Sequence, residues 1–328
     1  MIERATYINR DNEIVYPPPY EQADTFLTAW VLPSPKEKQQ AVLNAHLNAC
    51  SGGSPFEYRP LLSHALLVLA DIRRVTSLDP GAAQKGWIPE VDICTWLLCG
   101  AFKLVDGKRK LDHLVWYIPY IWVTTADTMA TGREAFGYPK AIGWAQLPEG
   151  PNDPGPLWAD GLVLPTFSPE TEVVQKRLFD LVRGAGCTSE AAPQTFGAGH
   201  KREAFEAIAK KLHEVGQADC DFNFFVQSFA ELLGGHIPMV FLKQFRDVTD
   251  PSAACYQAIV EANATVNGFS GAGFLPGGWD LQMYSYASVD MPAYLGFEPK
   301  QRIDLGFYVN FSFSMDLGKE VWRAGGSR

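Results

Sequence analysis

Two apolar runs rich in β-branched residues, 93–105 and 114–123, flank a short polar segment that contains Asp106-Gly107. An Asp-Gly pair between two such runs is typical of a tight β-hairpin. Further strand patterns follow at 238–245, 256–266, 280–286 and 306–315. Strands are therefore predicted before and after a helical segment and do not alternate with helices. The sequence predicts an α+β fold with antiparallel pairing rather than a doubly wound parallel sheet.

Helical patterns occur near the N-terminus and in the middle of the chain. The run Ser34-Pro35-Lys36-Glu37 has the form of a capping box and predicts a helix to about Asn48. Residues 124–127 predict the start of a short helix that ends near Gly137. Three more helices are expected within 168–234. The first begins at 168–170, the second ends at Gly216, and the third covers 222–233.

The length of 328 residues and an apolar content of 47% fit one large domain spanning residues 1–328. The proline- and aromatic-rich residues 1–30 are expected to form an N-terminal arm. Residues 149–165, rich in proline and glycine, predict a loop. The segment 168–234 then reads as a helical insertion.

Composition narrows the classes of partner. A net charge of −9 without a basic patch argues against nucleic acid, and no apolar stretch is long enough to favour a membrane span. The six cysteines are scattered, and the N-terminus lacks an apolar signal segment, so we expect a cytoplasmic protein with reduced thiols. Histidine and cysteine show no metal-ligand spacing. We therefore expect a small-molecule partner and neither a metal nor a cofactor.

One lysine stands in unusual surroundings. Lys140 follows Pro139 in one of the most aromatic parts of the chain. At an ordinary pKa of about 10.4, fewer than about one lysine in a thousand is neutral at pH 7. Burial or a nearby cation such as Arg133 lowers the pKa of an amine and makes it a nucleophile toward carbonyls. The pattern also fits an ordinary surface lysine after a turn.

Neighbouring side chains suggest partners for such an amine. Glu134 and Tyr138, with Tyr117 and Tyr120, are candidates for moving protons. Each also has a plain structural interpretation, as a salt bridge to Arg133 or as core packing. The candidate substrate-binding residues are the aromatic side chains Trp116, Tyr120, Trp122 and Phe136.

The segment 122–140 resembles the signature of the acetoacetate decarboxylase family. That signature is a strand, a short helix, Gly-Arg-Glu, an aromatic residue and Pro-Lys, which here are Gly132-Arg133-Glu134, Phe136 and Pro139-Lys140. Weaker similarities lie at 241–243, 255–259 and 279–284. The resemblance implies a β-barrel or cone-like core with peripheral helices and a homo-oligomer. It also implies that Lys140 forms a Schiff base with an oxo acid.

Three positions depart from the family pattern. The residue after the lysine is Ala141 where the decarboxylases have a second lysine. An arginine of the N-terminal strand has no counterpart around residues 21–24. A glutamate in the strand before the hairpin aligns near Thr95-Trp96, and both residues are uncharged.

We therefore expect a cofactor-independent lyase that forms a Schiff base between Lys140 and an oxo acid or related carbonyl compound. The outcome is decarboxylation or aldol and dehydration chemistry. The catalytic candidates are Lys140, Glu134, Arg133 and Tyr138. Two alternatives stay open: a member of the fold that binds a carbonyl or hydrophobic metabolite without turnover, and an acid–base cyclase or isomerase that uses Lys140 as the proton donor.

Overall fold

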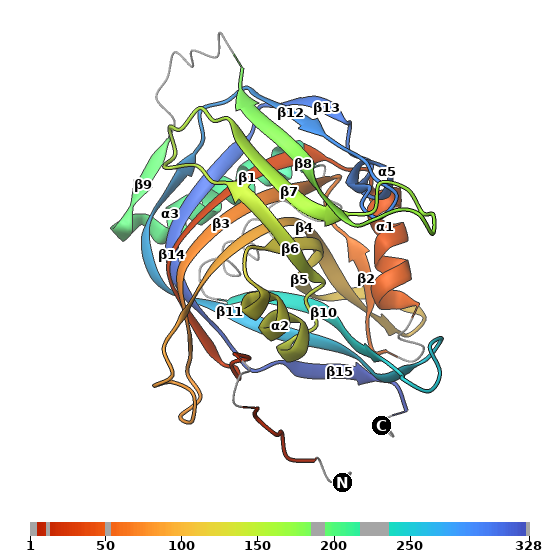
Figure 1. The fold of residues 1–328 in the computed structure, drawn as a ribbon. Coiled ribbons are helices and arrows are strands. Elements are labelled where there is room, and N and C mark those ends of the chain that lie inside the picture. Colours follow the sequence, from red (N-terminus) through yellow and green to blue (C-terminus); the bar gives the residue numbers. More distant parts are fainter. Residues whose placement is uncertain (1–4, 11–13, 50–53, 185–193, 217–235, 326–328) are drawn as a thin grey trace.

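Strands from both ends of the chain close into a barrel (Figure 1). The computed structural model describes residues 5–10, 14–49, 54–184, 194–216 and 236–325, and within these ranges seven strands form the closed ring. In order around the ring they are β1 (Tyr20–Pro33), β14 (Gly306–Met315), β11 (Ala254–Phe274), β10 (His236–Arg246), β5 (Lys108–Val123), β4 (Ile88–Val105) and β3 (His64–Ser77). All neighbours are antiparallel except β5 and β10, which run parallel. The α+β barrel prediction is confirmed.

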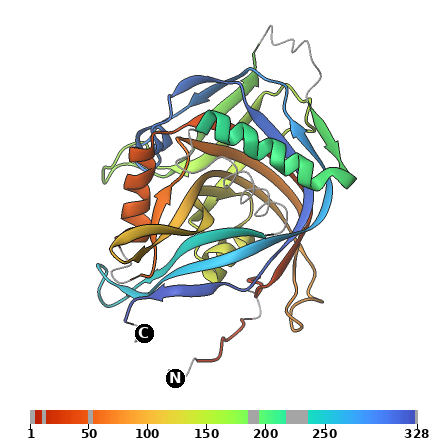
Figure 2. The same ribbon diagram turned by 180° about the vertical axis from the view of Figure 1, so that it is seen from behind.

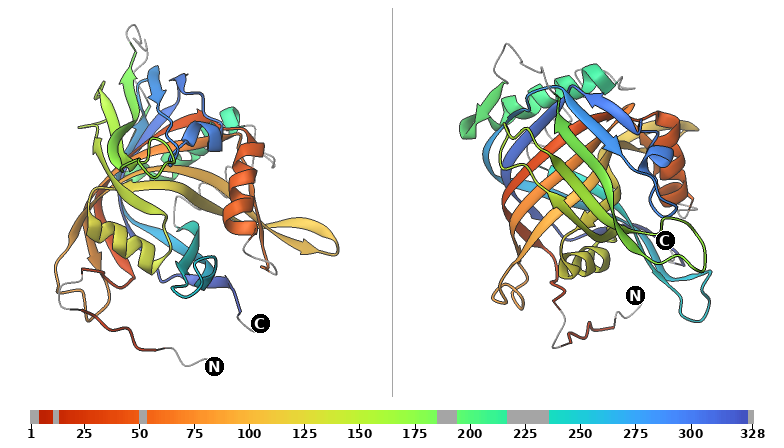
Figure 3. Two further views of the ribbon diagram at one scale, coloured as in Figure 1. Left: turned by 45° about the vertical axis from the view of Figure 1, so that its right-hand side comes forward. Right: turned by 45° about the horizontal axis from the view of Figure 1, so that its top comes forward.

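A second sheet lies against one side of the barrel (Figure 3). It consists of β6 (Lys140–Gln146), β7 (Leu157–Val163), β8 (Val174–Arg183), β12 (Trp279–Met283) and β13 (Lys300–Ile303). Its first strand continues from the barrel, because β6 pairs in parallel with the end of β5. Trp30 of β1 meets Trp279 of β12 edge to face, with ring centroids 5.3 Å apart. This contact joins the outer surface of the barrel to the second sheet.

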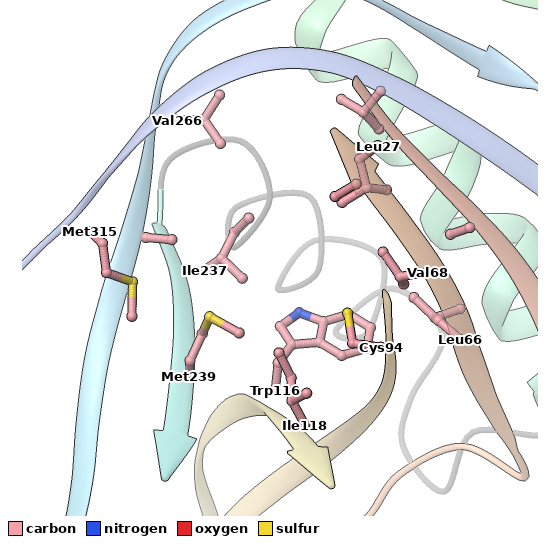
Figure 4. Close-up of a cluster of buried hydrophobic side chains, with 14 of the residues drawn as sticks. Leu27, Leu66, Val68, Cys94, Trp116, Ile118, Ile237, Met239, Val266 and Met315 are labelled. Atoms are coloured by element: carbon pink, nitrogen blue, oxygen red, sulfur yellow. The ribbon is translucent and has the colours of Figure 1, made fainter. Parts of the chain in front are cut away.

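Alternation along the barrel strands separates two apolar cores. One fills the barrel interior, where side chains such as Leu27, Val68 and Ile237 converge from different strands (Figure 4). The other contains Trp30, Leu67 and further outward-facing side chains, which pack against the second sheet. The barrel wall is therefore apolar on both faces over much of its surface.

Helices cover the openings of the barrel. Figure 2 places α3 (Lys201–Gly216) at one end and α2 (Ala126–Ala135) toward the other. The predicted start of α2 is confirmed, since the hydroxyl of Thr125 accepts the hydrogen bond of the Thr128 amide. None of the helices in the described ranges is long and apolar enough to cross a membrane.

The helix expected after residue 34 is also confirmed, but its predicted cap is not. α1 (Lys36–Leu43) continues as a π-helix over Asn44–Asn48. The Ser34 hydroxyl donates to the carbonyl of Leu295 in α5 (Met291–Leu295) and makes no capping contact. The remaining elements are β2 (Glu57–Pro60), β9 (Thr195–Gly197), the 3₁₀ turn Ala198–His200 and β15 (Lys319–Arg323).

Three expected boundaries are wrong. Residues 20–30 belong to β1 and not to an arm, and the expected loop at 149–165 contains β7. The first helix of the supposed helical insertion at 168–234 is strand β8. There, Leu178 has no register partner on β7, so Leu178 and Phe179 are both buried and the period-two pattern is lost. The second expected helix is α3, and the third falls at 222–233, outside the described residues.

A polar network joins four strands on the outside of the barrel: β2, β4, β5 and β11. His113 of β5 contacts Asp112 through Nδ1 at 2.8 Å and Glu261 of β11 through Nε2 at 3.2 Å. Tyr58 donates to the same glutamate, and Lys103 pairs with Asp112. Burial alone would lower the pKa of His113, but the two carboxylates outweigh it and the pKa is raised.

We predict a pH-dependent loss of stability in His113→Gln. A raised folded pKa means that this pairing stabilises the fold fully below the unfolded pKa of about 6.5 and is lost as pH rises through the folded value. The variant should be less stable than wild type by about 1 kcal/mol at pH 5.5, and the gap should close at high pH. Urea unfolding at several pH values measures it. His200→Gln on the surface is the control, and an equal gap at every pH would contradict the prediction.

Candidate active site around Lys140

Lys140 lies where the strand that pairs with β5 changes from β10 to β6. The middle of β5 pairs with β10 through Trp116 and Met239, and its end pairs with β6 through Ile121 and Lys140. Between these two pairings no strand of the described residues pairs with β5 on this side, and residues 137–139 of the turn after α2 lie around one outer groove with Pro119 of β5. Lys140 is the first residue of β6, so its side chain enters the barrel at this fork in the sheet.

The end of α2 and the turn after it explain why glycine and arginine precede the lysine. A Cβ on Gly132 would lie 2.7 Å from Cδ of Lys140 and 3.0 Å from its Nζ, so only glycine leaves room for the lysine. Gly137 has a φ of +93°, and a Cβ there would lie 2.5 Å from Cα of Lys243 on β10. Arg133 donates from its guanidinium to the backbone carbonyl of Lys140 at 3.1 Å. These contacts fix the lysine backbone against both α2 and β10.

The ammonium of Lys140 is buried in an acidic site. Its side chain is only 6% exposed, and Nζ forms a short ion pair with Glu90, which is 8% exposed. Asp92 lies two residues further along β4 with Oδ1 3.9 Å from Nζ. Residues i and i+2 of a strand face the same side, so both carboxylates point into the barrel. Tyr138 places its ring 5.1 Å from Nζ, within cation–π range.

Opposing forces set the protonation of this group. Burial lowers the pKa of Lys140, but the charges of Glu90 and Asp92 and the hydrogen bond to Glu90 outweigh it, so the pKa lies above its usual value. Burial, followed by the Glu90 charge, holds the pKa of Asp92 well above the ordinary range. Lys140 is therefore protonated in the free protein, and Asp92 retains a proton more readily than an ordinary aspartate.

The lysine opens into an apolar cavity of about 70 Å³. Its wall includes Leu27, Ile72 and Met239 beside Lys140. Two oxygen atoms at this wall have no hydrogen-bond partner among the described residues: Oγ1 of Thr25, which is 2% exposed, and Oδ1 of Asp92. Buried polar atoms are normally paired, so these two are free to bind a polar group of a ligand.

The structure brings together only some of the predicted site residues. Phe136 and Tyr138 line the cavity with Lys140. Arg133 binds the backbone of the lysine and faces a separate outer groove of about 340 Å³, which it shares with Tyr117. Glu134 is not among the described residues that line either space. The expected lowering of the lysine pKa by Arg133 is wrong, because its guanidinium contacts the carbonyl and the carboxylates dominate at Nζ.

A β-bulge separates the aromatic candidates on β5. Opposite Trp96 of β4, two residues of β5 occupy the place of one, which shifts the alternation by one residue. Trp116 therefore faces the interior, and it lines a second small cavity rather than that of Lys140. Tyr120 and Trp122 stack on each other at 5.8 Å and belong to the outer core. The sequence showed the aromatic run but not the phase shift inside it.

The two carboxylates are functional candidates that the sequence interpretation missed. The sequence alignment puts the family's glutamate near the uncharged Thr95 and Trp96, whereas the glutamate of this strand that reaches the lysine is Glu90. A usable pattern existed: Ile88, Glu90 and Asp92 continue the period-two series of β4 on its interior side. Acidic residues in phase with a buried strand face indicate a partnered or functional site.

Comparisons with solved structures agree with this architecture. The acetoacetate decarboxylase of Legionella pneumophila superposes with a TM-score of 0.59 at 12% identity, covering 98% of this chain and 94% of that one. The enduracididine biosynthesis enzyme MppR complexed with pyruvate gives 0.54 at 14% identity, with 95% and 93% covered. An acetoacetate decarboxylase-like enzyme from Sphingomonas wittichii RW1 gives 0.54 at 13%, with 96% and 98% covered.

The chain has the acetoacetate decarboxylase fold. No protein-family model and no curated protein sequence matches it. The likeness therefore lies in the acetoacetate decarboxylase-like barrel with its peripheral helices, while the sequence identity to these three structures is only 12–14%.

We predict that Gly132→Ala breaks the ion pair of Lys140 without unfolding the barrel. The new methyl group would displace Lys140 from Glu90, while alanine is favourable in a helix by up to about 1 kcal/mol relative to glycine. Because Glu90 raises the pKa of the amine, labelling of Lys140 by formaldehyde and cyanoborohydride, followed by peptide mass spectrometry, should rise at least several-fold in rate. Gly150→Ala is the control, because a Cβ there meets no atom within 4 Å. Equal labelling of Gly132→Ala and wild type would contradict the packing argument.

Proposed function

We propose that the protein is a cofactor-independent enzyme in which Lys140 condenses with a carbonyl substrate to form an iminium. The observation that carries this proposal is a lysine only 6% exposed, paired with Glu90 and beside Asp92 at the wall of an apolar cavity. Such an arrangement supplies an amine, a proton acceptor and a proton donor within one small space. The iminium is an electron sink that supports decarboxylation or aldol and dehydration chemistry, which makes a lyase the leading class.

Lys140, Glu90 and Asp92 together account for every proton that is transferred during the condensation. Lys140 first transfers a proton from Nζ to Glu90, and its neutral amine then attacks the carbonyl carbon to form a carbinolamine. The nitrogen proton moves to the former carbonyl oxygen. Asp92, which retains a proton unusually well, protonates the departing hydroxyl, and water leaves as the C=N bond forms. The resulting iminium cation stands beside the new Asp92 carboxylate, so the net charge of the site is unchanged.

The structural neighbours support this class of chemistry. One of them is an acetoacetate decarboxylase, and MppR has been solved both with pyruvate and with the condensation product of pyruvate and imidazole 4-carboxaldehyde. Barrels of this fold thus hold carbonyl compounds and their condensation products. Ala141 replaces the second lysine expected of a decarboxylase, which favours aldol and dehydration chemistry over loss of CO₂.

A second candidate function follows from the same ion pair. Because the pKa of Lys140 is raised, its resting state is an ammonium, which is also suited to donate a proton in cyclisation or isomerisation. This enzyme would lose activity in Lys140→Ala but would never form a covalent adduct. Trapping therefore separates the two candidates.

We predict that borohydride reduction in the presence of small ketones and aldehydes adds the reduced substrate at Lys140 and at no other lysine to the same extent. Intact-mass and peptide mass spectrometry measure the adduct. Lys140→Ala should abolish it, and Lys243→Ala is the control, since Lys243 is half-buried but donates to the carbonyl of Ala135. Adduct formation that is unaffected in Lys140→Ala would refute the nucleophile assignment.

A pH profile tests the role of Glu90. The carboxylate holds a proton on Lys140, so Glu90→Gln should lower the pKa of the amine and move the midpoint of trapping to lower pH. Below the wild-type midpoint the variant should therefore label faster at fixed pH. Glu134→Gln removes a carboxylate from α2 without touching the ion pair and should leave the midpoint in place. A shift in Glu134→Gln instead would favour the original sequence-based role of Glu134.

A further inference from the structure

The wall of the Lys140 cavity lacks the charge needed to bind a carboxylate. Among the described residues that line it, Lys140 is the one cation, and its ammonium is already paired with Glu90. Asp92 adds a second acidic group at the same wall. An anionic substrate would enter a poorly hydrated space beside the charged carboxylate of Glu90, and no described cation of the wall would remain to neutralise it. A site for oxo acids normally carries a further arginine or lysine for the carboxylate.

A second cavity extends the apolar space. It has a volume of about 40 Å³ and lies under α3, where Phe205 and Ile208 form part of its wall. Leu27, Trp96 and Ile237 line both cavities, so the two lie side by side in the barrel interior. The described residues around the second cavity are all apolar (Figure 4 shows several of them). Along the described residues of this wall, a ligand that extends away from the lysine meets hydrocarbon and indole surfaces.

The cavity volumes limit the size of the ligand. An apolar cavity of about 150 Å³ holds one benzene, and each of these two spaces is smaller. Together they fit a compound of about four to six heavy atoms. The unpaired oxygens of Thr25 and Asp92 offer hydrogen bonds to a carbonyl or hydroxyl group near the lysine.

We infer that the site selects small uncharged ketones or aldehydes over oxo acids, with the carbonyl at Lys140 and the hydrocarbon part directed past Trp96 toward α3. This inference rests on the proposed function for the position of the carbonyl. It narrows the substrate class that the family resemblance implies, because the acidic wall and the apolar extension both disfavour a carboxylate.

A matched pair of compounds tests the inference. 2-Pentanone and levulinate share a methyl ketone and carbon chain and differ in a terminal methyl or carboxylate group. 5-Methyl-2-hexanone, which has as many heavy atoms as levulinate but no charge, is the control for size and should be trapped better than levulinate. Wild type should bind and trap 2-pentanone at least about ten-fold better than levulinate at pH 7.5. Glu90→Gln should narrow that ratio in binding, because it removes the charged carboxylate of the wall and leaves the ammonium of Lys140 to meet the substrate anion. Glu134→Gln, which keeps both acidic groups of the wall, should leave the ratio unchanged.

The outcomes separate this inference from the proposed function. Equal or better trapping of levulinate by wild type overturns the selectivity and leaves the Schiff base intact. If neither compound is trapped, the Schiff base fails, and ligand-observed NMR of non-covalent binding to the wild-type protein then decides the selectivity alone. Preference for 2-pentanone supports it, and preference for levulinate or binding of neither compound overturns it.

A second variant tests the direction of the hydrocarbon part. Ile208 of α3 lines the second cavity and not the first. Ile208→Phe should fill that space and weaken 2-pentanone binding several-fold while acetone binding stays unchanged. Unchanged acetone binding also shows that the barrel is folded. Equal loss for both ketones, or no loss for either, would overturn the placement under α3.

Discussion

The ion pair between Lys140 and Glu90 is the interaction on which the site depends. A buried ammonium without a partner is so unfavourable that it would lose its proton or leave the barrel. Glu90 meets it in an interior that is otherwise apolar, and Asp92 stands within 4 Å. Removing either partner leaves the other charge buried, so the pair is an obligate unit of the folded state. Its chemistry follows from that constraint, since breaking the pair by proton transfer creates an amine and an acid together.

The topology of the barrel makes room for this pair. β5 exchanges β10 for β6 along one edge, and the turn after α2 lies around the outer groove there with Pro119 of β5. Gly132 and Gly137 are required because a side chain at either position would collide with the lysine or with β10. Arg133 closes the turn by binding the carbonyl of Lys140. The packing of the segment from Gly132-Arg133-Glu134 to Pro139-Lys140 therefore positions the Lys140 side chain inside the barrel.

The charged groups around the Lys140 cavity differ from those expected of a site that binds a substrate carboxylate. The carboxylates of the wall serve the lysine, and no described lining side chain remains to neutralise a substrate anion. A proton can pass among Lys140, Glu90 and Asp92 without altering the net charge of the site. Because the net charge of these three groups stays constant, the surrounding surface can stay apolar. The same property supports the proposal that the substrate is an uncharged carbonyl compound.

The sequence by itself determined the hairpin of β4 and β5, the cap of α2, the later strands and Lys140, because each depends on neighbours in the chain. Asp106-Gly107 and Thr125 act locally, and the lysine stands out against its own aromatic surroundings. Only the tertiary structure decided which side chains meet the lysine. A bulge opposite Trp96 turned Tyr120 and Trp122 away, and closure of the barrel placed β4 so that Glu90 reaches Lys140. A one-residue shift in a strand reverses its faces, and a contact between residues 50 positions apart is set by ring closure, so neither can be derived from local pattern alone.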